Sequence, residues 1–187
     1  MINPEIWKHF DCVIAVDPGL STGNGIICLS HKGVFDWSAL KNDSSAGSFE
    51  NRLSLHLHCL EDIYDNFVHD FMVESIDVEP VCLFAIENCF VGAGGNGALK
   101  QSELIGVQAM CAHRYMLPVV RVQPTQTKKA LTGRGKAKKD EDMVPHAIKL
   151  YPSVAEIKYK YQREAVADAI GVAIAGADKW LKENTDG

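Results

Sequence analysis

The chain has 187 residues, of which 47% are apolar and 23% are charged. This length and composition are typical of a folded globular domain, so we expect one domain over residues 1–187 with a core from about residue 12 to residue 182. Because the chain lacks a run of roughly 18 apolar residues and a basic-then-apolar opening, the sequence predicts neither a membrane span nor a secretory signal. We expect a soluble intracellular protein of the cytoplasm or nucleoid, and a phage or organellar origin stays open.

The formal net charge of −5 is unevenly distributed along the chain. Residues 104–139 contain eight Lys/Arg and no Asp or Glu, which leaves eleven Lys/Arg against all 24 Asp/Glu in the remainder, a formal charge of −13. A chain with this asymmetry can bind a polyanion at one surface while the rest repels it. A solvated loop is the simpler explanation of a run of charge, but the lack of acids over this segment favours contact with nucleic acid.

The first half of the chain is predicted to form strands and one long helix. Residues 12–17 are an apolar, β-branched run that ends at a Pro-Gly turn, which is typical of a buried strand. Residues 25–30 and 33–38 follow as the two strands of a hairpin or meander. From residue 48 to residue 71 apolar side chains recur at spacings of three and four, as on one face of a helix. Residues 81–87 are then a fourth strand.

The second half alternates helices with one more strand. A helix over about residues 98–116 has two apolar rows, which is more apolar surface than one sheet face needs, so a subunit interface is a reasonable hypothesis. Residues 119–122 form a fifth strand, followed by a basic helix and loop, a helix near 143–150 and a closing helix over about 162–182. This order predicts an α/β fold with a five-stranded mixed sheet flanked by helices.

Four carboxylates occupy positions from which they can converge. Asp17 and Glu87 end the first and fourth predicted strands, and Glu164 and Asp168 lie one turn apart on one face of the last helix, where Gly171 and Ala175 are small enough for close packing on the sheet. Such acids singly are more often turn caps or solvated helix residues. Asp168, however, lies inside AVADAIGVAIAGA, where a charge needs a partner or a metal. Convergent carboxylates suit two Mg²⁺ ions, or Mn²⁺ in their place, which can activate water against a phosphodiester.

The chain resembles the RuvC family of Holliday junction resolvases in four blocks that occur in the family's order: VIAVDPGLSTGNGII, FAIENCFVGAGGNGALK, TKKALTGRGKAKKDEDMV and AVADAIGVAIA. The resemblance covers most of residues 12–177. It implies a ribonuclease H-like fold, a homodimer, and Mg²⁺-dependent paired incisions across a four-way DNA junction. It also implies that Asp17, Glu87 and Asp168 are the metal-binding acids of the site.

One position departs from the family pattern. The family commonly has an acid or a histidine three residues before its final aspartate, whereas this chain has Ala165 there. The nearest acid is Glu164, which helix geometry keeps on the same side as Asp168. We therefore predict Glu164 as a fourth catalytic and metal-binding residue.

The resemblance also gives roles to residues outside the acidic set. Phe90 falls on the aromatic residue that stacks near the junction centre in the family, and Lys128 and Lys139 fall on two basic positions that support catalysis and backbone binding. The remaining predicted DNA contacts come from the basic segment, in which glycines at 133 and 135 would let the chain follow a phosphate backbone; they are Arg121, Lys129, Arg134, Lys136 and Lys138.

Three other functions fit part of the pattern. An actin-like kinase or ATPase would also use a strand-end aspartate and a glycine turn, but it needs a second phosphate-binding half that 187 residues can hardly hold. A related nuclease that acts on flap or other branched DNA would share the acids and the basic segment. A junction-binding protein without catalysis would keep the basic segment and Phe90, and Mg²⁺-dependent cleavage would separate it from the enzyme.

Overall fold

The computed structural model describes residues 1–19, 24–40, 48–75, 78–88 and 95–185. Its centre is the five-stranded mixed sheet that the sequence predicted, and the strand order is β3-β2-β1-β4-β5. The first three strands are an antiparallel meander, whereas β4 and β5 run parallel to β1. The strands are β1 (Cys12–Asp17), β2 (Asn24–Ser30), β3 (Gly33–Leu40), β4 (Cys82–Glu87) and β5 (Val119–Val122).

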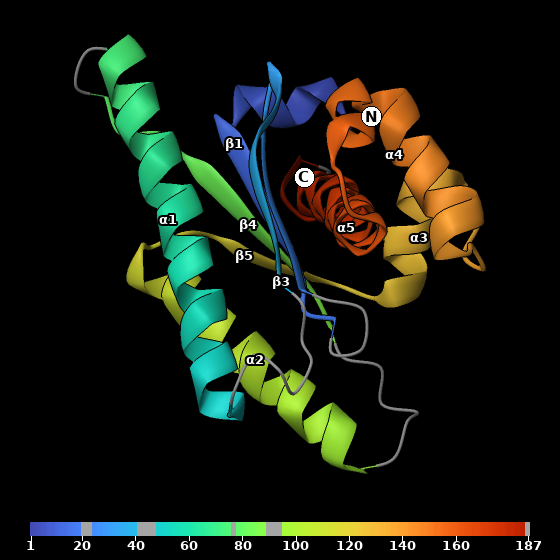
Figure 1. Ribbon diagram of the computed structural model, residues 1–187. Helices are drawn as coiled ribbons and strands as arrows, with labels where there is room; N and C mark the ends of the chain where they lie inside the picture. Colours follow the sequence, from blue (N-terminus) through green and yellow to red (C-terminus); the bar gives the residue numbers. More distant parts are fainter. Residues whose placement is uncertain (20–23, 41–47, 76–77, 89–94, 186–187) are drawn as a thin grey trace.

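Helices cover both faces of the sheet (Figure 1). Helices α1 (Phe49–Ser75) and α2 (Gly95–Arg114) lie on one face, and α5 (Lys160–Thr185) crosses the other with α3 (Pro124–Thr132) and α4 (Val144–Leu150) beside it. Three short turns complete the described chain, and the sequence had predicted none of them: η1 (Pro4–Lys8), the π-helical turn η3 (Lys139–Met143) and η4 (Pro152–Glu156). Among the described residues, no helix has both the length and the apolar character that a membrane crossing requires.

The central strands β1 and β4 are apolar at every residue before the final acid, because helices cover both faces of the sheet there. Side chains alternate between the two faces of a strand. Val13 and Ala15 of β1 belong to the core beneath α5, while Ile14 and Val16 belong to the core beneath α1 and α2. The same alternation in β4 places Ala85 beneath α5. The strand-end acids continue the row that faces α5.

Helix α5 lies unusually close to the sheet because small residues meet at the contact. A Cβ atom added at Gly25 would overlap the backbone carbonyl of Ala165, so this strand position has no room for a side chain. A Cβ added at Gly176 would lie 2.5 Å from the Cβ of Ala85. Real Cβ atoms do not approach other atoms this closely, so glycine at both positions is required by the packing.

The second glycine of α5, Gly171, makes a different contact from the one expected. The sequence placed Gly171 on the face that meets the sheet, but an added Cβ there would lie 2.8 Å from Thr127 Cγ2 and 3.3 Å from Met143 Cε. Gly171 therefore lets α3 and the π-helical turn pack against α5. This contact carries the basic segment to the helix that bears Asp168.

We predict opposite effects for two glycine-to-alanine substitutions in helices. Gly176→Ala should lower the free energy of unfolding by about 1–3 kcal/mol, because the new methyl group overlaps Ala85. Gly106→Ala in α2 is the control: no atom lies within 4 Å of its added Cβ, so it should be neutral or stabilise by roughly 0.5–1 kcal/mol through helix propensity. Denaturant unfolding of both variants checks this, and equal stability would contradict the close packing of α5.

Candidate active site

Asp17 and Glu87 meet at one edge of the sheet. They end two parallel neighbouring strands, whose last paired residues are Val16 and Ile86, so the two acids are next to each other in register. Both side chains continue the row of alternate residues that faces α5. Asp17 is only 4% exposed, and its carboxyl forms a hydrogen bond with Glu87.

Asp168 reaches these two acids from the helix side. It lies in the fully buried stretch of α5 and is 6% exposed. Its carboxyl forms a hydrogen bond with Asp17. The structure therefore brings together three of the four predicted acids, two from strand ends and one from the helix that crosses the sheet.

Burial raises the pKa of all three acids, and repulsion between carboxylates adds to this for Asp17 and Glu87. For Asp17, loss of solvation raises the pKa well above its usual value, and the nearby charges of Glu87 and Asp168 raise it further. Burial also raises the pKa of Glu87 and of Asp168, although Lys139 opposes the change in both. The cluster thus holds more negative charge than its own protein surroundings neutralise.

Lys139 is the cation inside this cluster. Its ammonium contacts Asp168 Oδ2 and lies 3.9 Å from Asp17 Oδ2, and its side chain is 33% exposed. Desolvation lowers the pKa of Lys139, but the neighbouring carboxylates outweigh it and the pKa is raised. Lys128, on α3, is half-buried, and its charge also lowers the pKa of Asp168. The two lysines given a catalytic role by the sequence therefore both act on Asp168.

Glu164 is held away from the three acids. Its carboxylate lies 3.5 Å from the ammonium of Lys160, which in turn contacts Asp140 at 3.2 Å. These residues line a small pocket of about 160 Å³ with Val144 and Arg163. The role of Glu164 as a metal ligand stays a prediction.

Thr127 is a site residue that the sequence analysis missed. It is 2% exposed on α3, and its hydroxyl hydrogen-bonds Glu87, which lowers the pKa of that acid. The same hydroxyl lies 3.4 Å from the carbonyl oxygen of Gln123. A threonine that begins a run of lysines looks like a polar surface residue, and the packing of α3 against Gly171 that buries it has no local signal in the sequence.

The predicted DNA-binding residues do not all share one surface. Val120 and Val122 belong to the core beneath α5, so Arg121 between them points to the opposite face of the sheet. Lys129 and Lys136 are exposed, and no ion pair is recorded for either within the described part of the chain. Phe90 lies outside the described residues.

Two cations of the basic segment are paired with acids that follow it in sequence. Arg134 contacts Asp142 at 2.9 Å, and Lys138 contacts Glu141 at 2.9 Å. The acids begin at residue 140, immediately after the segment that has none, and the turn η3 folds them back onto it. The surface is therefore less positive than the charge count over 104–139 indicated.

Comparison with known proteins gives the family. The model of the family "Crossover junction endodeoxyribonuclease RuvC" matches residues 13–176. Proteins of that name from Shewanella piezotolerans and Chloroherpeton thalassium are 30% and 27% identical over 166 residues, which cover 87% of this chain and 84% and 80% of theirs.

The fold agrees with solved structures. Thermus thermophilus RuvC aligns with a TM-score of 0.61 at 19% identity over 92% of this chain and 96% of that one. The same protein in complex with a Holliday junction substrate aligns with a TM-score of 0.63 at 21% identity over 94% and 97%. The sheet is the ribonuclease H-like sheet that the resemblance implied, and the chain belongs to the RuvC family of crossover junction endodeoxyribonucleases.

Proposed function

We propose that this protein resolves four-way DNA junctions by hydrolysing phosphodiesters in a reaction that needs Mg²⁺. The observation that carries the proposal is the cluster of buried Asp17 and Asp168 with half-buried Glu87, at one sheet edge beside the basic surface of α3 and its following loop. Buried carboxylates next to exposed cations are what a metal-dependent enzyme needs to act on a polyanion. The relatives are named for this activity, which supports the substrate class.

The donor set fits a divalent cation. Three carboxylates supply hard oxygen ligands, and one ammonium, that of Lys139, leaves two negative charges uncompensated when all three acids are ionised. No three acidic, histidine or cysteine side chains among the described residues are already spaced as a metal site. Lys139 contacts Asp168 and lies 3.9 Å from Asp17, so it would stand beside a bound ion and share in balancing the charge of the acids. Glu164 stays a proposed fourth ligand.

The residues of the site have separate roles in the reaction. Asp17, Glu87 and Asp168 would hold the metal, and when bound the metal supplies Lewis-acid stabilisation of the charge that develops on the phosphodiester oxygens. Thr127 orients Glu87 through its hydroxyl. Lys139 and Lys128 bring positive charge to the carboxylates where the phosphate must approach, and so counter the repulsion between the acids and the DNA.

We also propose that two copies act together. Paired incisions across a junction need one active site for each cleaved strand. Helix α2 and the turn after it leave large apolar side chains exposed: Leu99 is 59%, Met110 74% and Met116 89% exposed. Exposed apolar side chains of this kind are typical of a surface that a partner covers, and a second copy of this chain accounts for it.

The first prediction tests the proposed reaction itself. The protein should cut a four-way junction in Mg²⁺, cut a flap and a plain duplex at least about tenfold more slowly, and cut nothing in EDTA. Asp168→Asn should abolish cleavage while leaving junction binding within about twofold, because it removes a metal ligand and leaves the basic surface in place. Preference for the flap would favour the related nuclease, and binding without any cleavage would favour a non-catalytic junction-binding protein.

The second prediction concerns the stability of the metal-free protein. The pKa of Asp17 is raised in the folded state, so the folded chain holds a proton that the unfolded chain releases, and stability falls as pH rises above the usual carboxyl range. Asp17→Asn should therefore raise the free energy of unfolding at pH 7 by at least about 1 kcal/mol, or roughly 2–4 °C in Tm, and should flatten its pH dependence.

Thermal melts in EDTA between pH 5 and pH 8 measure this effect. Asp178→Asn is the control: Asp178 is a half-buried acid of α5 whose pKa burial raises while Lys182 and the N-terminus lower it, so its substitution should stabilise the protein less than Asp17→Asn does. If Asp17→Asn melted lower than the wild-type protein throughout, the carboxylate cluster would not be electrostatically strained.

The third prediction concerns the basic surface. Lys129→Ala combined with Lys136→Ala should weaken junction binding and reduce the slope of log K against log salt by up to about 2, because two phosphate contacts are removed. Lys182→Ala, an exposed lysine in the last turn of α5, is the control and should leave the slope unchanged. Filter binding over a salt series gives the slope, and an unchanged slope in the double variant would remove these lysines from the DNA surface.

A further inference from the structure

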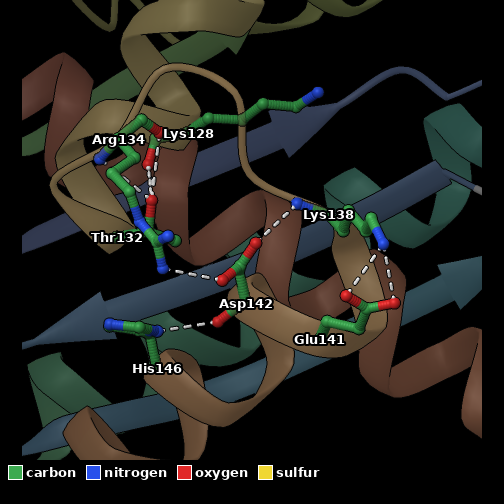
Figure 2. A network of polar contacts seen from close by, with 7 residues as sticks. All are labelled: Lys128, Thr132, Arg134, Lys138, Glu141, Asp142 and His146. Carbon is green, nitrogen blue, oxygen red and sulfur yellow. Dashed lines mark hydrogen bonds and ion pairs between the residues drawn. The ribbon is translucent and has the colours of Figure 1, made fainter.

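One carboxylate closes the loop that joins α3 to the π-helical turn η3 (Figure 2). Asp142 Oδ1 accepts a hydrogen bond from Arg134 Nη2 at 2.9 Å, near the start of the loop. Asp142 Oδ2 accepts a hydrogen bond from the backbone N–H of Lys138 at 3.0 Å, at its end. A single side chain therefore ties both ends of the segment 134–138 to the turn that follows it.

Asp142 is itself firmly held. Its backbone carbonyl lies 2.8 Å from Nδ1 of His146, and its own N–H donates to the carbonyl of Lys138 at 3.0 Å. The next residue, Met143, is fully buried and packs near Gly171 of α5. The Asp142 side chain is only 20% exposed, compared with 69% for Arg134. These contacts fix the backbone of Asp142, and so fix the position from which its carboxylate binds the loop.

The beginning of the loop is tied to α3 in a complementary way. Gly133 ends α3 with φ 77°, a left-handed conformation that favours glycine, and its N–H donates to the carbonyl of Lys129. The hydroxyl of Thr132 accepts from the N–H of Arg134 at 3.2 Å and lies 2.8 Å from the carbonyl of Lys128. Because Arg134 is fixed to α3 at its backbone and to Asp142 at its guanidinium, the loop has little freedom to change shape.

Lys139 follows directly after the amide that Asp142 holds. It is the first residue of η3, and from there its ammonium enters the carboxylate cluster at Asp168 and Asp17. The Lys138 amide has no partner one turn earlier in the turn that it begins, so Asp142 supplies the missing acceptor as a cap does. π-helical turns are rare and recur at functional sites. Asp142 thus caps the amide of Lys138, the residue immediately before η3.

We propose that Asp142 is a positioning residue for catalysis: by accepting the Lys138 amide and the Arg134 guanidinium it fixes the start of η3, and so directs Lys139 into the acidic cluster. This inference rests on the proposed function. It assigns a role to an acid that follows the basic segment directly in sequence. Arg134 then acts through Asp142, because its guanidinium holds the Asp142 carboxylate in place.

Glu141 provides a matched control. It is the neighbouring acid of the same turn and also pairs with a lysine of the basic segment, Lys138, at 2.9 Å. Its side chain is 64% exposed, and no backbone group of the loop is recorded as its partner within the described part of the chain. An exposed pair of this kind contributes little to stability or to loop geometry.

The experiment is a double-mutant cycle on single-turnover cleavage of a four-way junction in Mg²⁺. Asp142→Ala should lower the cleavage rate by roughly 10- to 100-fold, as expected for a catalytic group displaced by about 1 Å, with junction affinity within about twofold. Asp142→Asn keeps an oxygen acceptor for the Lys138 amide and should recover part of the rate. Glu141→Ala should cleave at the wild-type rate. In the Lys139→Ala background, Asp142→Ala should cost less than a further twofold.

Amide hydrogen exchange over residues 138–143 gives a readout that needs no cleavage. Asp142→Ala should lose protection there, and Glu141→Ala should keep it. Additive losses of rate in Asp142→Ala and Lys139→Ala, or unchanged exchange in Asp142→Ala, would overturn the proposal. If the wild-type protein cuts no junction, the proposed function fails, while the exchange measurement still decides whether Asp142 holds the turn.

Discussion

The separation between α5 and the sheet governs where every group of the acidic cluster lies. An aspartate side chain is short, so Asp168 can meet Asp17 only if the helix backbone comes very near the strand. Gly25 and Gly176 allow that approach, because each lies where a methyl group would overlap an atom of the facing element. The same helix buries most of its surface in the core, and its height above the sheet is therefore set by packing that cannot relax locally.

This packing explains the electrostatics of the site. Asp17 and Asp168 are taken out of water by the elements that hold them, and their charges repel in a medium that screens poorly. Lys139 relieves part of the repulsion without neutralising it. Repulsion between buried like charges lowers the free energy of unfolding. Proteins keep such unfavourable electrostatics where a cation or a substrate is to be bound.

The sequence predicted what depends on short-range patterns and missed what depends on distant contacts. The five strands follow from short apolar runs, two of which stop at Asp17 and Glu87, and these lie where they were expected. The contact of Gly171 with α3, the burial of Thr127 and the return of Asp142 onto the basic segment each join parts of the chain by packing. No local pattern distinguishes a solvated acid from one that closes a loop.

The same close contact includes Ala165, the position where this chain departs from the family pattern. Ala165 is fully buried, and its carbonyl meets Gly25 in the contact that sets the height of α5. This contact is made by the Ala165 backbone, so it fixes the path of the helix at the residue before Val166. The nearest acid, Glu164, lies 100° further round the helix, and it turns to Lys160 at the rim of the site. Of the four predicted acids, Asp17, Glu87 and Asp168 therefore lie together, while Glu164 pairs with Lys160.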